Sequence, residues 1–198
     1  MTWKEKVFNL PNRLTFLRII LTLVFLPFVF IPGLLPKIMA FLTFSLASFT
    51  DWYDGYAARK FKLETDFGKL IDPIADKILI FSCFLAFLQM NLVKAWMVIV
   101  ILSREIIITA LRLYALNRGK VIGASLMGKH KLVSQVVAIY CILLSLILKE
   151  ALSLQGIEFP QVEKITNFLI YLSMLTTVVL TTISGISYIW KNRDLLET

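Results

Sequence analysis

Long apolar runs constrain this chain more than any other feature of its sequence. Only 17% of its 198 residues are charged, and 58% are hydrophobic. A helix needs about 20 apolar residues to cross the hydrocarbon core of a bilayer. The sequence therefore predicts an all-α, polytopic membrane protein with six transmembrane helices, over Leu14–Ile31, Lys37–Arg59, Asp72–Met90, Leu92–Leu116, Lys131–Leu148 and Ile165–Trp190.

The connections between these spans are short, which predicts one membrane domain over residues 1–198. Lys and Arg collect in the cytoplasmic loops of membrane proteins. Here they are concentrated in the N-terminal segment, the Arg59–Lys77 link, the Arg112–Lys131 link and the tail from Lys191. We therefore expect both termini on the cytoplasmic side of the cell inner (cytoplasmic) membrane.

Three smaller features are consistent with this class of protein. The net charge of +8 fits cytoplasmic loops that face anionic headgroups, so it requires no nucleic-acid partner. Cys83 and Cys141 lie within apolar runs and are expected to be free thiols rather than a disulfide or a metal pair. Trp3–Leu10 mixes aromatic, apolar and basic residues, and is compatible with a short interfacial helix or with a frayed tail.

The stretch DWYDGYAARKFKLETDFGKLIDPIADK, Asp51–Lys77, places carboxylates at the cytoplasmic edge of this apolar sequence. Asp51 and Asp54 are three positions apart, and Asp72 and Asp76 are four apart. Either spacing puts both members of a pair on one helix face. We therefore expect a hairpin of the second and third spans to bring the four aspartates together.

Four clustered carboxylates require compensating positive charge. Oxygen ligands without His or Cys favour a hard cation such as Mg²⁺, Mn²⁺ or Ca²⁺, and four carboxylates can hold two ions. Acidic residues at the ends of spans are otherwise solvated flanks, which is the interpretation preferred for Glu64 and Asp66. Gly68 can turn the chain or leave room for a phosphate, and Lys69 suits a polyphosphate group.

Read with its gaps, the stretch is Asp51-x2-Asp54-Gly55-x2-Ala58-Arg59-x8-Gly68-x3-Asp72-x3-Asp76, and it resembles the full signature of the CDP-alcohol phosphotransferases. The resemblance implies that a hydroxyl attacks a CDP-activated lipid or alcohol and that CMP leaves. It also implies that the four aspartates hold two divalent ions and that Asp76 is the general base. Homodimers are typical of the family. The residues that would line the CDP site are Asp54, Gly55, Ala58 and Arg59, together with Gly68 and Lys69.

Three further segments resemble bacterial phosphatidylglycerophosphate synthases: Pro11–Ile19, Arg104–Arg112 and Ala124–Gln135. The last departs from the usual pattern, because Leu132 stands where a Thr is common. This likeness implies Mg²⁺ or Mn²⁺ as cofactor, CDP-diacylglycerol as donor and glycerol 3-phosphate as acceptor. Membrane lipids would surround the enzyme, and its active site would face the cytoplasm.

The acceptor is a small dianion, so its site requires cations. Arg104 and Arg112 are eight residues apart in the fourth span, and Lys129 and Lys131 precede the fifth. These four are the expected phosphate-binding residues, although the lysines are also typical positive flanks and Arg104 can serve a structural ion pair. Because adjacent helical residues point to different faces, Glu105 need not neutralise Arg104. Two more residues, Asn12 and Thr15, would bind cytidine or cap the first helix.

Other interpretations keep the fold and change the acceptor. Inositol phosphate also presents a phosphate to basic residues, whereas phosphatidylglycerol would give cardiolipin, and serine or an aminoalcohol would give other headgroups. An alternative of another class is a divalent-cation transporter, since intramembrane acids also line ion pathways. The apolar character of the third, fifth and sixth spans beyond their cytoplasmic ends disfavours transport.

Overall fold

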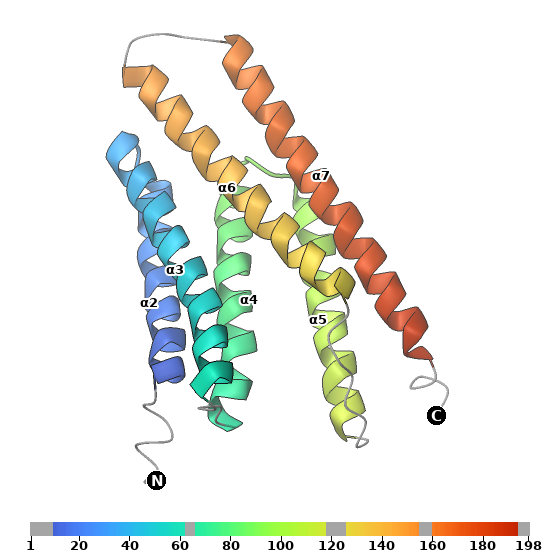
Figure 1. Ribbon diagram of the computed structural model, residues 1–198. Coiled ribbons are helices and arrows are strands. Elements are labelled where there is room, and N and C mark those ends of the chain that lie inside the picture. The colour runs from blue at the N-terminus through green and yellow to red at the C-terminus, as the bar shows by residue number, and fades with distance from the viewer. Residues whose placement is uncertain (1–9, 62–65, 118–125, 155–159, 194–198) are drawn as a thin grey trace. The chain divides into compact units, whose positions relative to one another are not determined.

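A computed structural model of the chain describes residues 10–61, 66–117, 126–154 and 160–193. Within these ranges, side chains are described except at 10–13, 51–74, 76, 116–117 and 126–129. The described residues form six α-helices joined by short turns and undescribed links (Figure 1). They are α2 (Leu10–Phe30), α3 (Leu34–Phe61), α4 (Asp66–Gln89), α5 (Ala95–Asn117), α6 (Leu126–Leu154) and α7 (Pro160–Lys191).

The prediction of an all-α chain is confirmed, but most of the predicted spans are shorter than the helices. At the N-terminal ends of three of the apolar runs, α2, α4 and α6 begin four to six residues before Leu14, Asp72 and Lys131. The backbone hydrogen-bond pattern of a helix continues into polar sequence, whereas hydropathy stops at the first charges. The fourth helix differs in the opposite direction, because α5 begins at Ala95, three residues after the predicted start at Leu92.

Two of the described helices are long and apolar enough to cross a membrane: His130–Leu154 within α6, and α7. Three shorter apolar helical segments accompany them, at Leu14–Phe30, Leu34–Thr50 and Lys77–Gln89. Six spans with both termini in the cytoplasm therefore stay a prediction. The predicted interfacial segment Trp3–Leu10 falls almost entirely outside the described residues.

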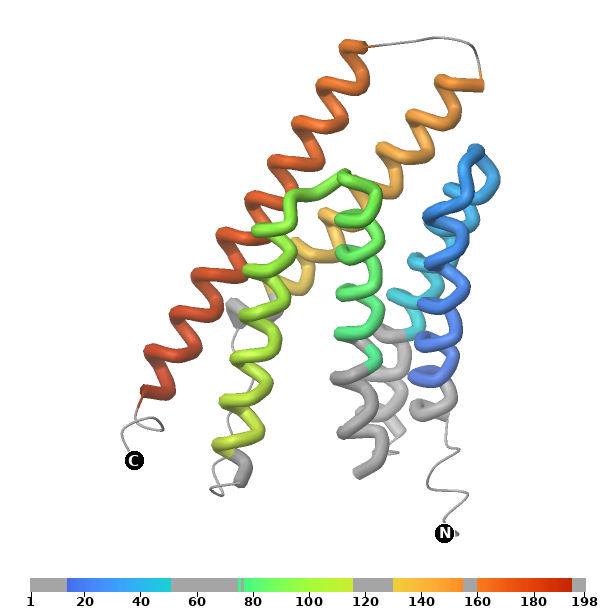
Figure 2. Tube along the Cα trace, turned by 180° about the vertical axis from the view of Figure 1, so that it is seen from behind, coloured from blue at the N-terminus to red at the C-terminus, as the bar shows by residue number. Residues whose placement is uncertain are grey.

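The chain divides into two compact units, Met1–Ala86 with Leu143–Glu158, and Phe87–Ile142 with Phe159–Thr198. In the first unit, α2 and α3 lie side by side as an antiparallel hairpin (Figures 1 and 2). Phe25 packs on Phe44 with ring centroids 6.2 Å apart. Small residues of α3 allow the close approach of the two helices, and the fully buried ones are Ala40 and Ala47.

The turn between α2 and α3 is fixed by two residues. Gly33 has φ 109°, a conformation that glycine adopts without strain. Lys37 folds back so that its Nζ donates to the carbonyl oxygens of Val29 (2.5 Å) and Ile31 (2.9 Å). The last carbonyls of a helix lack intrahelical donors, so this buried ammonium caps the C-terminal end of α2.

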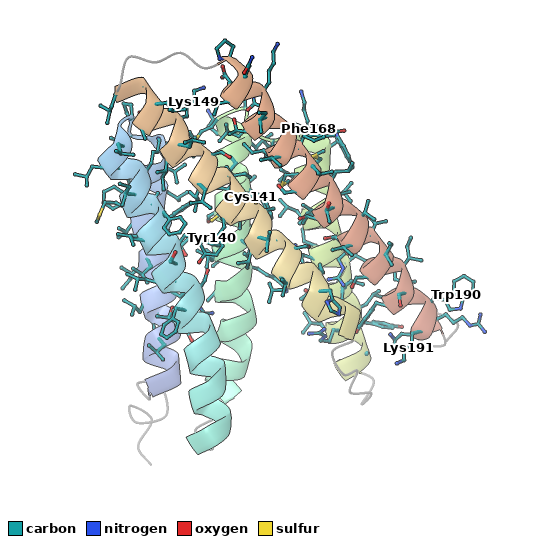
Figure 3. The ribbon with its side chains drawn as sticks, turned by 45° about the horizontal axis from the view of Figure 1, so that its top comes forward. Tyr140, Cys141, Lys149, Phe168, Trp190 and Lys191 are labelled. Carbon is teal, nitrogen blue, oxygen red and sulfur yellow. The ribbon has the colours of Figure 1, made fainter. Side chains whose placement is uncertain are left out.

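The second unit contains α5, the first part of α6, and α7, with α5 lying beside α7 (Figure 2). A tight turn leads into α5. Asn91, at φ 57°, donates its amide to the carbonyl of Leu88, and Leu92 donates to that of Phe87. Asn is among the few non-glycine residues that adopt this conformation readily. At the far end of α7, Trp190 and Lys191 point away from the helices (Figure 3).

The expectation for the cysteines is confirmed: Cys83 and Cys141 are free thiols, and Cys83 is buried. Many apolar side chains outside the helix contacts are exposed, including Ile99 on α5 and Ile186 on α7. Such exposure is expected of a helix surface that faces lipid.

Candidate active site

The signature aspartates lie on two helices of the first unit. Asp51 and Asp54 belong to α3, and Asp72 and Asp76 belong to α4. Helical backbone at all four positions preserves the spacing that places each pair on one helix face. Their side chains lie outside the described part of the structure. The second pair was expected at the start of its helix. Because α4 begins at Asp66, Asp72 and Asp76 instead lie one to three turns inside the helix.

The residues expected around CDP are likewise placed only by their backbone. Gly55, Ala58 and Arg59 are helical in α3, and Gly68 and Lys69 are helical in α4, with side chains outside the described set. Gly68 lies within the first turn of α4, so it does not turn the chain. The other role expected for it, leaving room for a phosphate, stays a prediction.

Asn12 and Thr15 both lie inside α2, which begins at Leu10. Thr15 is more than one turn from that end, so the prediction that it caps the helix is wrong. Its side chain is buried, with 1% exposure. Asn12 lies in the first turn, and its side chain is not described. Recognition of cytidine by these two residues stays a prediction.

In the second unit, Arg104 is held by two neighbours. Its Nη2 donates to Ser184 Oγ of α7 at 2.8 Å, and its Nη1 lies 3.3 Å from Glu105 Oε1. Glu105 therefore does pair with Arg104, which the sequence had left open. Adjacent Cα–Cβ bonds do diverge, but these two side chains are long enough to turn toward the same space beside α7.

Glu105 also accepts a hydrogen bond from Lys131 Nζ of α6. Lys131 is 7% exposed, so it is not a solvated positive flank. Glu105 therefore bridges a cation of α5 and a cation of α6. We refer to Arg104, Glu105, Lys131 and Ser184 together as the Arg104 cluster.

A small residue next to Ser184 makes room for this cluster. A Cβ at Gly185 would come within 3.0 Å of Arg104 Cγ and 3.7 Å of its Nε. Arg104 thus lies directly against the backbone of α7, where any larger residue would press on its side chain.

Of the remaining expected acceptor residues, Arg112 is exposed but close enough to Arg104 to interact with it electrostatically. Lys129 is helical in α6, and its side chain is not described. The structure thus joins Arg104 and Lys131 through Glu105, with Arg112 near enough for its charge to act on Arg104. Their position relative to the aspartates, which belong to the other unit, stays a prediction.

Sequence reasoning missed three of the residues found here. Ser184 and Gly185 are about 80 positions from Arg104 and carry no signal of their own. Glu105 was left aside because adjacent helical residues point to different faces.

A separate cavity of about 250 Å³ lies between the turn before α5 and the first half of α7. Its lining includes Lys94, Asn167 and Tyr171, and among these described lining residues there is no carboxylate. Lys94 is ten residues before Arg104, or about 15 Å along a helix. The cavity is therefore distinct from the Arg104 cluster.

Comparison with known proteins decides the family. Residues 8–183 match the family model of the CDP-alcohol phosphatidyltransferases. The chain belongs to this family. The protein is therefore an enzyme, a CDP-alcohol phosphatidyltransferase, rather than a transporter.

Curated relatives extend along most of the chain. The chain is 37% identical to a CDP-diacylglycerol--glycerol-3-phosphate 3-phosphatidyltransferase of Bacillus subtilis, over 97% of this chain and 99% of the relative. It is 40% identical to a probable phosphatidylglycerophosphate synthase of Mycobacterium tuberculosis, over 69% of this chain and 66% of the relative. It is 37% identical to a CDP-diacylglycerol--glycerol-3-phosphate 3-phosphatidyltransferase of Rickettsia bellii, over 69% of this chain and 75% of the relative.

CDP-alcohol phosphatidyltransferases depend on divalent metal, and the donor set of this chain fits one. Asp51, Asp54, Asp72 and Asp76 offer hard carboxylate oxygens, as Mg²⁺ and Mn²⁺ require. Their helical spacing allows each pair to converge from one face.

Proposed function

We propose that this chain transfers the phosphatidyl group of CDP-diacylglycerol to glycerol 3-phosphate, giving phosphatidylglycerophosphate and CMP. The observation that carries the choice of acceptor is the Arg104 cluster. Two cations and one carboxylate give it a formal charge of +1, and Arg112 beside it raises this to +2. A phosphate monoester carries about −2 at neutral pH, so the charges match, whereas a neutral alcohol would leave these cations uncompensated.

In this proposal, the residues act in two groups. Arg104, Arg112, Lys129 and Lys131 bind the acceptor phosphate. The aspartates hold two Mg²⁺ or Mn²⁺ ions, which when bound neutralise the donor pyrophosphate and polarise its phosphorus. Asp76 accepts the proton of the attacking hydroxyl as general base.

The donor occupies the side of α3 and α4 that carries the signature. Its CDP contacts are made by Asp54, Gly55, Ala58 and Arg59, with Gly68 and Lys69 near the phosphates. Asn12 and Thr15 of α2 complete the cytidine site. The buried position of Thr15, on the α2 face that packs against α3, supports this role.

The proposal includes a single membrane domain over residues 1–198 with six transmembrane helices. Both termini and the active site face the cytoplasm, and the protein resides in the inner membrane as a homodimer among its lipid substrates. The distribution of Lys and Arg and the apolar helices support this arrangement.

The experiment that tests the proposed function measures CMP release by the purified protein in detergent, with CDP-diacylglycerol and Mg²⁺. Glycerol 3-phosphate, inositol phosphate, serine and phosphatidylglycerol are supplied in parallel. Release that requires both the metal and glycerol 3-phosphate supports the proposal. Release with inositol phosphate alone would keep the chemistry and overturn the acceptor.

A further inference from the structure

Buried polar atoms without partners occur in the Arg104 cluster and within about one helical turn of its members on α6 and α7. Among the residues that the structure describes, Arg104 Nε, Gln135 Nε2, Thr181 Oγ1 and Tyr188 Oη are buried and make no hydrogen bond within the protein. All four belong to the second unit. Buried polar groups in proteins are normally paired with protein, water or ligand, so this group of atoms indicates that the site is completed by a polar molecule.

The four atoms are close to one another along their helices. Thr181 and Tyr188 are three and four residues from Ser184 on the buried face of α7, which is about one turn to either side. Gln135 is one turn from Lys131 on α6. Tyr188 is also near enough to Arg104 to interact with it electrostatically.

Tyr188, unlike Thr181, cannot satisfy its hydroxyl within its own helix. A threonine hydroxyl can rotate to bond the carbonyl four residues earlier, as Thr177 does with Ser173 and Thr182 does with Val178. A tyrosine hydroxyl lies too far from its own backbone for that. Tyr188 is 5% exposed, so bulk water does not replace the missing partner.

We propose that Tyr188 is a specificity residue that contacts the acceptor, and that its hydroxyl binds a non-reacting hydroxyl of a small polyol phosphate beside Arg104. This inference rests on the proposed function. In glycerol 3-phosphate, the phosphate pairs with Arg104, through its free Nε–H, and with Lys131. The terminal hydroxyl attacks the donor, and the central hydroxyl pairs with Tyr188.

The test compares glycerol 3-phosphate with 3-hydroxypropyl phosphate, which keeps the phosphate and the attacking hydroxyl but lacks the central one. Tyr188→Phe removes the phenolic oxygen and preserves the ring. Wild-type protein should use the analogue less well than glycerol 3-phosphate. We expect Tyr188→Phe to lower kcat/KM for glycerol 3-phosphate about three- to tenfold and leave kcat/KM for the analogue unchanged. The KM for CDP-diacylglycerol should also stay at its wild-type value.

Tyr171→Phe is the matched control, because it removes the same oxygen from an exposed tyrosine of the same helix. It should leave the preference between the two acceptors intact. If Tyr188→Phe lowers kcat/KM equally for both acceptors, or for neither, Tyr188 does not recognise the hydroxyl and the inference is overturned.

Calorimetric binding of the two acceptors, without CDP-diacylglycerol, separates this inference from the proposed function. Tighter binding of glycerol 3-phosphate than of the analogue, abolished by Tyr188→Phe, supports the inference even if turnover is absent. Absence of CMP release from wild-type protein would contradict the proposed function. Equal binding of both acceptors by wild-type protein would contradict the role of Tyr188.

Discussion

Replacing Gly185 by alanine tests whether Arg104 is positioned by its contact with α7. The new Cβ would lie 3.0 Å from Arg104 Cγ, whereas unstrained carbon contacts are about 3.5–4.0 Å. Arg104 Cγ must therefore give way by a few tenths of an ångström. Its 2.8 Å hydrogen bond to Ser184 Oγ would lengthen and weaken as a result. Both the charge and the number of donors at the site stay the same.

Complete loss of this hydrogen bond sets the upper limit of the effect. A hydrogen bond to a charged group contributes about 1.5–3 kcal/mol, which corresponds to about 10- to 100-fold in binding. We expect the KM for glycerol 3-phosphate to rise by up to that amount, while the KM for CDP-diacylglycerol stays within about twofold. Helix propensity acts in the opposite direction, because alanine is favoured over glycine by up to about 1 kcal/mol.

The assay is steady-state CMP release at varied acceptor and donor concentrations, with thermal unfolding in detergent measured on the same samples. Ser187→Ala, at an exposed position on the same helix, is the control. A Gly185→Ala protein with a wild-type acceptor KM would refute the positioning argument. A large loss of thermal stability would instead mean that α7 itself had moved.

Three further perturbations test other parts of the account. Asp72→Asn should abolish CMP release and leave the unfolding temperature near that of wild type; substantial activity in this variant would contradict the metal site. Arg112→Ala should raise the acceptor KM much more than the CDP-diacylglycerol KM, and equal effects on the two would remove Arg112 from the acceptor site. Lys37→Met removes both capping hydrogen bonds of α2 and should cost about 1–3 kcal/mol of stability, seen as a fall of roughly 2–10 °C in Tm. Lys94→Met, at an exposed lysine, should leave Tm unchanged, and the Lys37 interpretation fails if both variants melt alike.

The helical class and the signature aspartates could be predicted because their signals are local. Apolar runs define helices, and separations of three and four residues define a shared face. The ends of the helices were predicted less well. Lys131 illustrates the reason: the fifth span was predicted to begin at this charged residue, but α6 starts five residues earlier and buries it against Glu105.

The polar contacts of the second unit could not be predicted from sequence, because they join residues far apart in the chain. Ser184 and Gly185 become meaningful only when α7 packs on α5 and their small side chains receive Arg104. In the sequence, Tyr188 is simply an aromatic residue of an apolar span. Only the structure shows that its hydroxyl is buried without a partner among the described residues. Glu105 shows that the directions of adjacent Cβ atoms do not limit where long side chains end.

The transfer of label from glycerol 3-phosphate into lipid tests the central claim most directly. Purified protein is incubated with CDP-diacylglycerol, Mg²⁺ and radiolabelled glycerol 3-phosphate, and the chloroform-soluble label is compared with the CMP released. The account predicts phosphatidylglycerophosphate and CMP in equal amounts, both dependent on the metal. Label that stays in the aqueous phase while CMP is released with another acceptor would contradict it.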